Sequence, residues 1–582
     1  MLLVGCTEPP FPLLPTPAAS TAEIDPALGL NLPEDTQIGQ YDGVEFVVAG
    51  PQVDNPYDPA QADLRAYFHA PSGAVQMAPA FWSQPFDRQT RRAGVPGWRL
   101  RFTPHEAGKW HVYLEDALTS RRSATVAFTV TPAAARGFVR IDAQNPRYFA
   151  YDNGEPMLVI GLNMGWSNGD VLADYERWFD VLSQNGGNMA RVWMASWAFG
   201  IEWRDTGLGD YRHRMYEAWL LDQLFQMAEA RGITIMLTLI NHGAFSTSVN
   251  PEWEANPYNA VNGGPLSNPA AFVEDAQAKA LFKRRLRYIA ARWAYSPSLF
   301  AWEWWNEVNW TGIDDRALTP WLQEMTPVLR EFDPYDHLIT NSFSNGAGSS
   351  TWALPEIDLS QQHDYTGGDL LETLTIDQRR IANTAPGKPL LMAELGYSAG
   401  AQIELDAMHL HTGLWAAPFL GYAGGSMYWW WDTFVDVQDQ WRQFGALARF
   451  FAEEDVGTFA PGTAEILPEG AQALVLQKAD RALVWVRSDA YSVPAAQAMY
   501  DKAIREAIKT KQKLTDWRYE PAELSGLSLS VPGLNDGDYL LRWYNPETGE
   551  WGAEEELQIA GSAATVTMPT FHTDLAFKIV QR

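Results

Sequence analysis

Between Gly137 and Ala452 the sequence alternates short apolar runs with longer amphipathic stretches, and this alternation restricts the possible folds more than any other feature. Continuous apolar runs are typical of strands in a parallel sheet that is covered on both faces. The pattern therefore predicts a central (β/α)8 TIM barrel, whose weakest unit is 347–356 because it offers no convincing helix. A doubly wound open sheet is the structural alternative, but no Gly-rich phosphate loop accompanies it. The eight predicted strands are 157–162, 188–194, 233–240, 299–305, 338–340, 357–361, 389–393 and 424–431.

In the regions on either side of this barrel, apolar and polar residues alternate with the period of two that is typical of β-strands. Runs such as Val44–Val48 and Leu64–Phe68 are separated by turn sequences such as Pro96-Gly97, which predicts an immunoglobulin-like β-sandwich. Short strands return after Phe459 and predict a C-terminal β-sandwich, interrupted by a polar helical insert near 495–513. We expect a multidomain chain whose parts are a tether, a sandwich, a barrel and a second sandwich, at 1–35, 36–132, 137–456 and 459–582.

Composition excludes several classes of function. The chain has 43 basic and 71 acidic residues, so its net charge of −28 disfavours nucleic acid and anionic lipid as partners. No apolar run approaches the ~18 residues of a transmembrane segment. Neutral substrates remain open, and 26 tryptophans provide flat apolar faces suited to packing or to stacking on sugar rings.

The single cysteine, Cys6, lies in a Leu-Val-Gly-Cys sequence that is similar to the bacterial lipobox. A Pro-rich run at 7–22 follows it, as a tether would. This predicts a lipid anchor at Cys6 in an exported, extracellular or cell-surface lipoprotein; the alternative is an unstructured tail with an incidental cysteine, because hardly any leader precedes the motif. One cysteine excludes an intrachain disulfide and a cysteine-based zinc site.

Two glutamates close predicted barrel strands. Asn306-Glu307 follows the fourth strand and Glu394 closes the seventh. Residues at the carboxyl ends of barrel strands face the active site, and cleavage of a glycosidic bond requires two carboxyl groups across the scissile bond. A salt bridge or a helix N-cap contact is the alternative for either residue alone. Glu303, four residues before Glu307, is predicted to be a buried carboxylate without a catalytic role.

The strand-end motifs resemble those of glycoside hydrolase clan A. The Trp-Glu-x-x-Asn-Glu motif at 302–307 resembles that of family five, which has cellulase- and β-mannanase-type barrels. The N-terminal sandwich is similar to the immunoglobulin-like leader domain that precedes such barrels. The resemblance implies that Glu307 is the general acid/base, that Glu394 is the nucleophile and that Asn306 donates to the sugar 2-hydroxyl.

The same resemblance implies further substrate-binding residues at the other strand ends. Arg191 would lie beside the nucleophile, where a nearby cation lowers a carboxylate pKa. Strand alternation places Trp429 and Trp431 on one face and Trp430 on the other, and we expect the first two to face the sugar. His242, His363 and Tyr365 complete the implied sugar site.

Together these features predict a retaining hydrolase of β-linked glycans, with mannan or glucan as the substrate, that needs neither cofactor nor metal. Long inserts at 198–213 and 243–268 would narrow the cleft toward an exo-acting pocket. Two other functions remain open: a carbohydrate-binding surface protein with an inactive barrel, and a transglycosylase that uses the same two glutamates.

Overall fold

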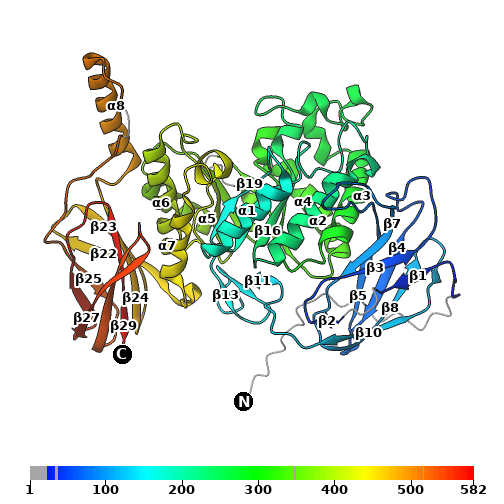
Figure 1. Cartoon of the computed structure of the whole chain (residues 1–582), viewed down its shortest axis with the longest axis horizontal. Helices are drawn as coiled ribbons and strands as arrows, with labels where there is room; N and C mark the ends of the chain where they lie inside the picture. Colours follow the sequence, from blue (N-terminus) through cyan, green and yellow to red (C-terminus); the bar gives the residue numbers. More distant parts are fainter. Residues whose placement is uncertain (1–22, 33–36, 345–348, 515–516) are drawn as a thin grey trace.

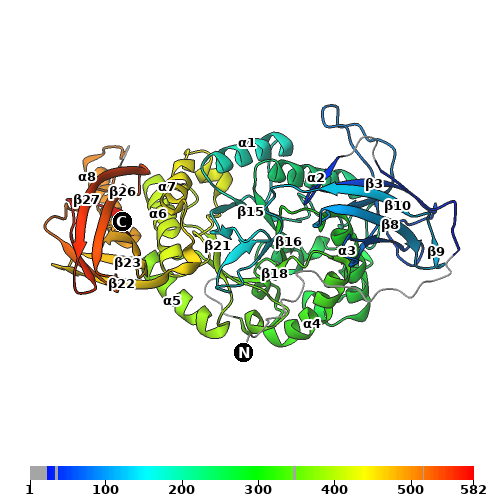
Figure 2. The ribbon, with the colours of Figure 1, turned by 90° about the horizontal axis from the view of Figure 1, so that it is seen from below.

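A computed structural model describes residues 23–32, 37–344, 349–514 and 517–582. A central α/β region is flanked by a β-rich region at each end (Figure 1), and a perpendicular view shows the same arrangement (Figure 2). The predicted lipid anchor at Cys6 and the run that follows it lie outside the described residues. In the described part of the chain, no helix combines the length and the apolar character needed to cross a membrane.

The N-terminal region forms a β-sandwich. One sheet has the order β1 (Gly29–Asn31), β3 (Val44–Ala49), β7 (Gly97–Phe102), β6 (Phe81–Ser83). The other has the order β2 (Ile38–Gly39), β10 (Val126–Thr131), β8 (Gly108–Asp116), β4 (Leu64–His69), β5 (Val75–Pro79), with β9 (Arg121–Arg122) paired to β8. Phe68 of one sheet stacks on Phe102 of the other with ring centroids 3.7 Å apart, so the two inner faces share one aromatic core.

The central region is of the TIM-barrel type, with parallel strands that follow one another in chain order. The first five pair as β14 (Gly161–Asn163), β15 (Met189–Trp193), β16 (Thr234–Ile240), β17 (Leu299–Trp305) and β18 (Leu338–Thr340). Only Asn341 separates β18 from β19 (Ser342–Phe343), so these two form the fifth strand of the barrel. The parallel order continues from β19 to the sixth and seventh strands, β20 (Ser360–Asp364) and β21 (Leu390–Leu395). Every residue of β15, β16 and β17 is buried, as expected for strands covered on both faces.

The last predicted strand, 424–431, differs from expectation. Single parallel bridges join Gly424 to Val159 and Tyr428 to Leu395, so 424–428 lies between the first and seventh strands. Beyond Tyr428 the backbone leaves the extended conformation: Phe434 N–H donates to the Trp430 carbonyl, and a π-helix spans Trp431–Val435. The strand is therefore shorter than predicted, and alternation of side chains does not extend through Trp431.

Helices cover the outside of the strands. They are α1 (Val171–Gln184), α2 (Met215–Glu229), α3 (Ala276–Trp293), α4 (Asp315–Phe332), α5 (Leu370–Thr384), α6 (Ile403–Phe419) and α7 (Trp441–Phe451). An aspartate side chain caps the first turn of four of them, namely Asp170, Asp275, Asp314 and Asp369. Among the described residues of the fifth unit, a short 3₁₀ turn at Ser350–Ala353 takes the place of a helix, consistent with the weak pattern there.

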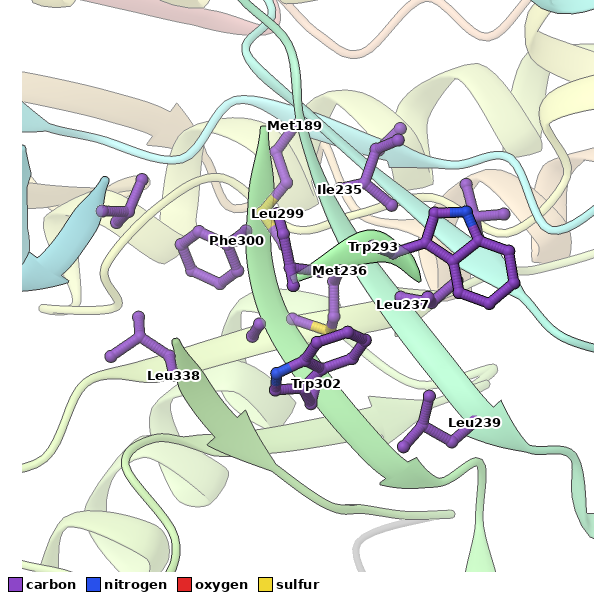
Figure 3. Packing of buried hydrophobic residues seen from close by; sticks show 14 of the residues in the cluster. Met189, Ile235, Met236, Leu237, Leu239, Trp293, Leu299, Phe300, Trp302 and Leu338 are labelled. Atoms are coloured by element: carbon purple, nitrogen blue, oxygen red, sulfur yellow. The ribbon is translucent and has the colours of Figure 1, made fainter. Parts of the chain in front are cut away.

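Apolar side chains from neighbouring strands interlock inside the barrel wall. Figure 3 shows Met236 of β16 and Trp302 of β17 close together, with Leu338 of β18 nearby. Trp302 is fully buried, and its indole N–H donates to Asp333 (2.9 Å). A small antiparallel sheet of β11 (Val139–Ile141), β12 (Phe149–Tyr151) and β13 (Pro156–Met157) precedes the first strand. This packed wall holds the strand ends rigidly in place.

The strands of the C-terminal region form one continuous eight-stranded antiparallel sheet that folds over on itself. The order is β27 (Glu550–Ile559), β26 (Gly537–Asn545), β29 (Asp574–Gln581), β24 (Arg481–Ser488), β23 (Ala471–Lys478), β22 (Ala460–Leu467), β25 (Ser528–Pro532), β28 (Ala563–Thr567). The first half of β22 pairs with β23 and its second half with β25, so the order folds over its own apolar core. The predicted helical insert is α8 (Val493–Thr510), which projects from this region in Figure 1.

Candidate active site

The fourth and seventh barrel strands bring Glu307 and Glu394 to the same cavity. Glu394 lies within β21, whereas Glu307 follows the end of β17 and has left-handed backbone angles, φ 47° and ψ 54°. Non-glycine residues rarely adopt this conformation, and such strain is concentrated at functional sites. The Glu307 N–H donates to Ser342 Oγ (3.0 Å), which fixes the turn that carries the carboxylate out of the strand.

The two carboxylates are close neighbours. One oxygen of each, together with a ring nitrogen of His363, forms a set whose atoms all lie within 4.8 Å of one another. His363 Nδ1 is 3.1 Å from Glu307 Oε1 and 3.3 Å from Glu394 Oε2, so it bridges the pair from below. His363 itself is fully buried. The predicted convergence of the two glutamates is thus present in the geometry.

Arg191 binds several side chains on the buried side of the site. It donates from Nη1 to Glu394 Oε2 (2.8 Å) and from Nη2 to Asn306 Oδ1 (2.7 Å). Its Nε and Nη2 also bind both oxygens of Glu303, at 2.7 and 2.8 Å. Glu303 is fully buried and accepts a further hydrogen bond from Thr238 (2.6 Å), in agreement with its prediction as a buried carboxylate.

The hydrogen bonds define the orientation of Asn306 and the tautomer of His242. Because Asn306 Oδ1 accepts from Arg191, its Nδ2 must be the atom that lies 2.7 Å from His242 Nδ1. His242 Nδ1 then accepts, and the proton of the neutral ring belongs on Nε2, whose 3.4 Å contact with Asn250 Nδ2 is a contact of two donors and not a hydrogen bond. Burial lowers the pKa of His242 to about 4, so the ring is neutral at ordinary pH.

Each glutamate has a separate hydrogen-bond donor. The Tyr365 hydroxyl donates to Glu394 Oε1 (2.5 Å), and the Trp310 indole donates to Glu307 Oε2 (3.1 Å). The two donors approach different carboxylates, so each can be altered without removing the other's partner.

The pKa values of the two glutamates both lie above the ordinary range. Burial raises the pKa of Glu307 to about 7, with Arg191 and Trp310 opposing the shift. Burial also raises the pKa of Glu394, although His363, Arg191 and Tyr365 oppose it. Arg191 lowers the pKa of Glu394, as expected, but burial outweighs the cation and the net shift is upward.

The cavity that contains both glutamates has a volume of about 410 Å³. Among the described residues that line it, none is Lys or Arg, and its walls are rich in tryptophan. His242, Asn306 and Tyr365 line it together with the glutamates, whereas Arg191 and His363 lie behind them. The tryptophans of the wall are Trp166, Trp193, Trp197, Trp429 and Trp430.

The eighth-strand tryptophans correct one prediction. Trp429 lines the cavity as expected, but its neighbour there is Trp430 and not Trp431. Trp431 is 2% exposed and packs edge-on against Trp166, with ring centroids 5.1 Å apart. The alternation argument was wrong because the chain enters the π-helix at Trp431.

Sequence reasoning missed several residues of the site, among them Asn163, Asn250 and Trp430. Asn163, which ends β14, accepts a hydrogen bond from Arg191 (3.1 Å); a polar residue at the end of an apolar run was an available signal. Asn250 lies in the long insert after β16 and lines the cavity, as does Trp430. Nothing in the local sequence distinguishes Asn250 from other polar insert residues.

In the part of the chain that the structure describes, one group of residues offers three potential metal-ligand atoms, and it is the set Glu307, His363 and Glu394. The guanidinium of Arg191 already lies 2.8 Å from Glu394. A fixed positive charge at that distance disfavours a second cation, so the donor set fits proton transfer better than metal binding.

Comparisons with known proteins were made with the sequence and with the fold. A domain of unknown function (DUF5060) matches residues 37–115. Mannan endo-1,4-β-mannosidase A of Podospora anserina is 26% identical over 244 residues, which cover 38% of this chain and 59% of that protein. The probable mannan endo-1,4-β-mannosidase A of Aspergillus oryzae is 25% identical over 336 residues, covering 50% of this chain and 81% of that protein. The chain thus spans less than two thirds of the Podospora relative.

Solved structures with low sequence identity share the fold. A Bacteroides vulgatus protein described as a candidate glycoside hydrolase aligns with a TM-score of 0.59 at 15% identity, covering 94% of this chain and all of that one. A family 5 glycoside hydrolase from the same organism aligns with a TM-score of 0.52 at 14% identity, covering 77% and 94%. The sequence relatives confirm the resemblance to glycoside hydrolases, and the structures confirm a fold of the TIM-barrel type.

Proposed function

We propose that the protein is a retaining hydrolase of β-linked glycans, in which Glu394 is the nucleophile and Glu307 the general acid/base. The separation of the two carboxylates carries this proposal, since one oxygen of each lies within a set of atoms at most 4.8 Å apart. Retaining enzymes hold their carboxyl groups about 5–5.5 Å apart, whereas inverting enzymes need about 6.5–9.5 Å to admit a water molecule.

In the first step a Glu394 oxygen attacks the anomeric carbon while the bond to the leaving oxygen breaks, and Glu307 gives its proton to that oxygen. In the second step a water oxygen attacks the same carbon, its proton passes to Glu307, and the bond to Glu394 breaks. One water is consumed, and two inversions at the anomeric carbon give net retention. The pKa of Glu307, raised to about 7 by burial, suits a group that must be protonated at the start.

The surroundings support these roles. Arg191 and Tyr365 bind the two oxygens of Glu394 and orient it for attack. Arg191 also fixes the amide of Asn306, and Asn306 lines the cavity where a sugar hydroxyl would lie. We assign substrate contacts to Asn306, His242, Tyr365, Trp429 and Trp430, and positioning roles to Arg191 and His363.

We propose a neutral polysaccharide as the substrate, with β-mannan first and β-glucan second. The lining has aromatic faces and uncharged polar groups besides the two glutamates, and no described lining residue is a cation that would select an acidic sugar. The names of the sequence relatives, which are mannan endo-1,4-β-mannosidases, favour mannan.

The same proposal includes the organisation of the chain. We propose a (β/α)8 catalytic barrel at 137–456, an immunoglobulin-like leader at 36–132, a C-terminal β-sandwich at 459–582, and export of a protein tethered through Cys6. The leader assignment is supported by its two facing sheets, and the barrel by the bridges of Gly424 and Tyr428 to the strands on either side.

The test is hydrolysis of β-1,4-mannan and β-1,4-glucan, with product sizing and NMR of the first anomer released. We expect reducing ends from mannan and initial release of the β-anomer. Initial release of the α-anomer would contradict the retaining mechanism. Binding of both glycans without cleavage would indicate a carbohydrate-binding protein, and products longer than the starting oligosaccharide would indicate a transglycosylase.

A further inference from the structure

A second cavity of about 420 Å³ lies where α7 meets the C-terminal sheet. Its walls come from the end of α7, the 452–454 segment and strands β24, β26, β27 and β29. Five cations line it against two carboxylates, Glu453 and Glu454, although the whole chain has 71 acidic and 43 basic residues. Two of these cations also pair with carboxylates beside the cavity, Arg542 with Glu554 at 2.7 Å and Arg582 with Glu556 at 2.8 Å, so one positive charge remains in excess where the whole chain has an excess of acid. The cations are Arg449, Arg481, Arg542, Lys578 and Arg582.

The buried part of this cavity has fewer anions than cations. Glu454, whose side chain is 4% exposed, pairs with Arg481 at 2.9 Å and with Lys578 at 2.6 Å. One carboxylate thus faces two cations, and a positive charge remains in excess. Burial lowers the pKa of Lys578 despite the contact with Glu454, so a further anion nearby would stabilise its charged form.

The outer part of the cavity presents guanidinium groups beside an aromatic ring. Arg449 donates to the carbonyl oxygens of Gly549 (3.0 Å) and Thr548 (3.4 Å), which are neutral acceptors that leave its charge uncompensated. Arg542 lies over the Trp551 ring at 4.6 Å and pairs with Glu554 at 2.7 Å. A guanidinium has five N–H donors in a planar fork, more than these contacts use, and the fork matches carboxylate and phosphate oxygens.

We propose that this cavity, defined by Arg449, Arg481, Arg542, Lys578, Arg582 and Trp551, binds a sugar-sized molecule that carries an anionic oxygen group, either carboxylate or phosphate. Its volume falls within the range of about 300–1,000 Å³ typical of small-molecule sites, much more than a bare ion needs. The catalytic cavity has no cation among its described lining residues, so the two cavities select different chemistry. Binding here does not depend on the proposed hydrolase activity.

The first experiment is calorimetric titration of the full chain at constant ionic strength with four probes: methyl β-glucuronide, glucose 6-phosphate, methyl β-glucoside and inorganic phosphate. We expect one of the two charged sugars to bind at least tenfold more tightly than both the neutral glucoside and inorganic phosphate. Preference for the glucuronide identifies a carboxylate ligand, and preference for glucose 6-phosphate a phosphate ligand. Failure of both to bind, or equal binding of the glucoside or of inorganic phosphate, overturns the proposal.

The second experiment uses matched variants. We expect R449Q/R542Q to weaken binding of the charged sugar at least tenfold. In R88Q/R121Q, which removes two exposed arginines at the N-terminal sandwich, binding is expected to be unchanged. If the double variant does not fold, the single variant R582Q replaces it, because the Arg582 side chain is half-exposed at the rim of the cavity. We expect R582Q to weaken binding of the charged sugar severalfold. Unchanged binding in folded R449Q/R542Q, or in R582Q, places the charged sugar elsewhere and overturns the proposal.

Discussion

Arg191 at the barrel mouth and Arg292 beneath the N-terminal sandwich are equally buried and both bind carboxylates. The pKa values of the carboxyl groups around them nevertheless shift in opposite directions. Both side chains are 0% exposed and both grip a carboxylate with two nitrogens. Arg292 binds Asp222 at 3.0 and 2.7 Å, and Arg101 of β7 binds the same aspartate at 2.7 Å. The second cluster therefore fastens the sandwich to α2 and α3 of the barrel.

The clusters differ in their ratio of cations to carboxylates. Burial alone would raise the pKa of Asp222, but Arg101 and Arg292 outweigh it and lower the pKa to about 2. At the mouth, Arg191 alone serves Glu303 and Glu394, with Glu307 close by. At Glu303 the contact with Arg191 outweighs burial and the pKa is lowered. At Glu307 and Glu394 burial prevails and the pKa values are raised. A shortage of cations thus lets Glu307 hold a proton near neutral pH, as the proposed acid must and a structural ion pair need not.

The largest expected effect is on turnover. E394Q removes the proposed nucleophile and E307Q the proposed proton donor, so each variant should lose at least about a hundredfold in kcat, up to about 10⁴-fold. The rates are measured on mannan, with circular dichroism as the check on folding. E106Q, at an exposed turn of the sandwich, is the matched control and should retain normal turnover. Near-normal hydrolysis by both active-site variants would remove these glutamates from the mechanism.

The structural cluster should respond in stability and not in chemistry. D222N leaves the buried Arg292 without its carboxylate and Arg101 with Glu45 alone, which should cost about 3–5 kcal/mol of unfolding free energy. Denaturant unfolding measures this, and the folded fraction should keep its turnover. D180N, which breaks the partly exposed pair of Asp180 with Arg231, should cost less than about 1 kcal/mol. Equal costs for the two variants would mean that burial does not distinguish these ion pairs.

Glu307 should also link stability to pH. Its folded pKa is about 7 and its ordinary value is 4.5, so the stability that comes from the protonated, buried carboxyl is complete below pH 4.5 and is lost as the pH rises through 7. Glutamine does not ionise. The unfolding free energy of E307Q relative to wild type should therefore rise by about 1–3 kcal/mol between pH 4.5 and pH 8. At pH 8 the E303Q variant should have a lower unfolding free energy than wild type, because the substitution breaks the buried pair of Glu303 with Arg191. A pH-independent difference for E307Q would contradict the raised pKa.

The comparison also explains what the sequence could predict. Glu307 and Glu394 were predictable because each directly closes an apolar run, and strand ends of a barrel converge. The clasp of Arg101 with Asp222 was not, because its members are 121 positions apart and belong to different folding units. The same is true of the cationic cavity, whose residues extend from Arg449 to Arg582.

Local periodicity failed where the backbone changed its hydrogen-bonding pattern. The prediction for Trp431 assumed a strand through that residue, whereas Phe434 and Asp436 donate back into a helical turn. The raised pKa of Glu307 could not be read from the motif either, because its main cause is burial. Burial depends on the full three-dimensional packing, and the motif alone does not contain it.

The smallest effects should separate the two glutamates within the catalytic cluster. Y365F removes a donor that lowers the pKa of Glu394, so the acidic limb of the kcat/KM profile should move up by about one pH unit. W310F removes the corresponding donor to Glu307 and should move the alkaline limb up instead, above its wild-type position near pH 7. The profiles are measured from pH 4 to 9 on the same oligosaccharide, and each variant serves as the control for the other. If both substitutions move the same limb, the two carboxyl groups titrate as one unit, and the separate assignment of acid and nucleophile loses its support.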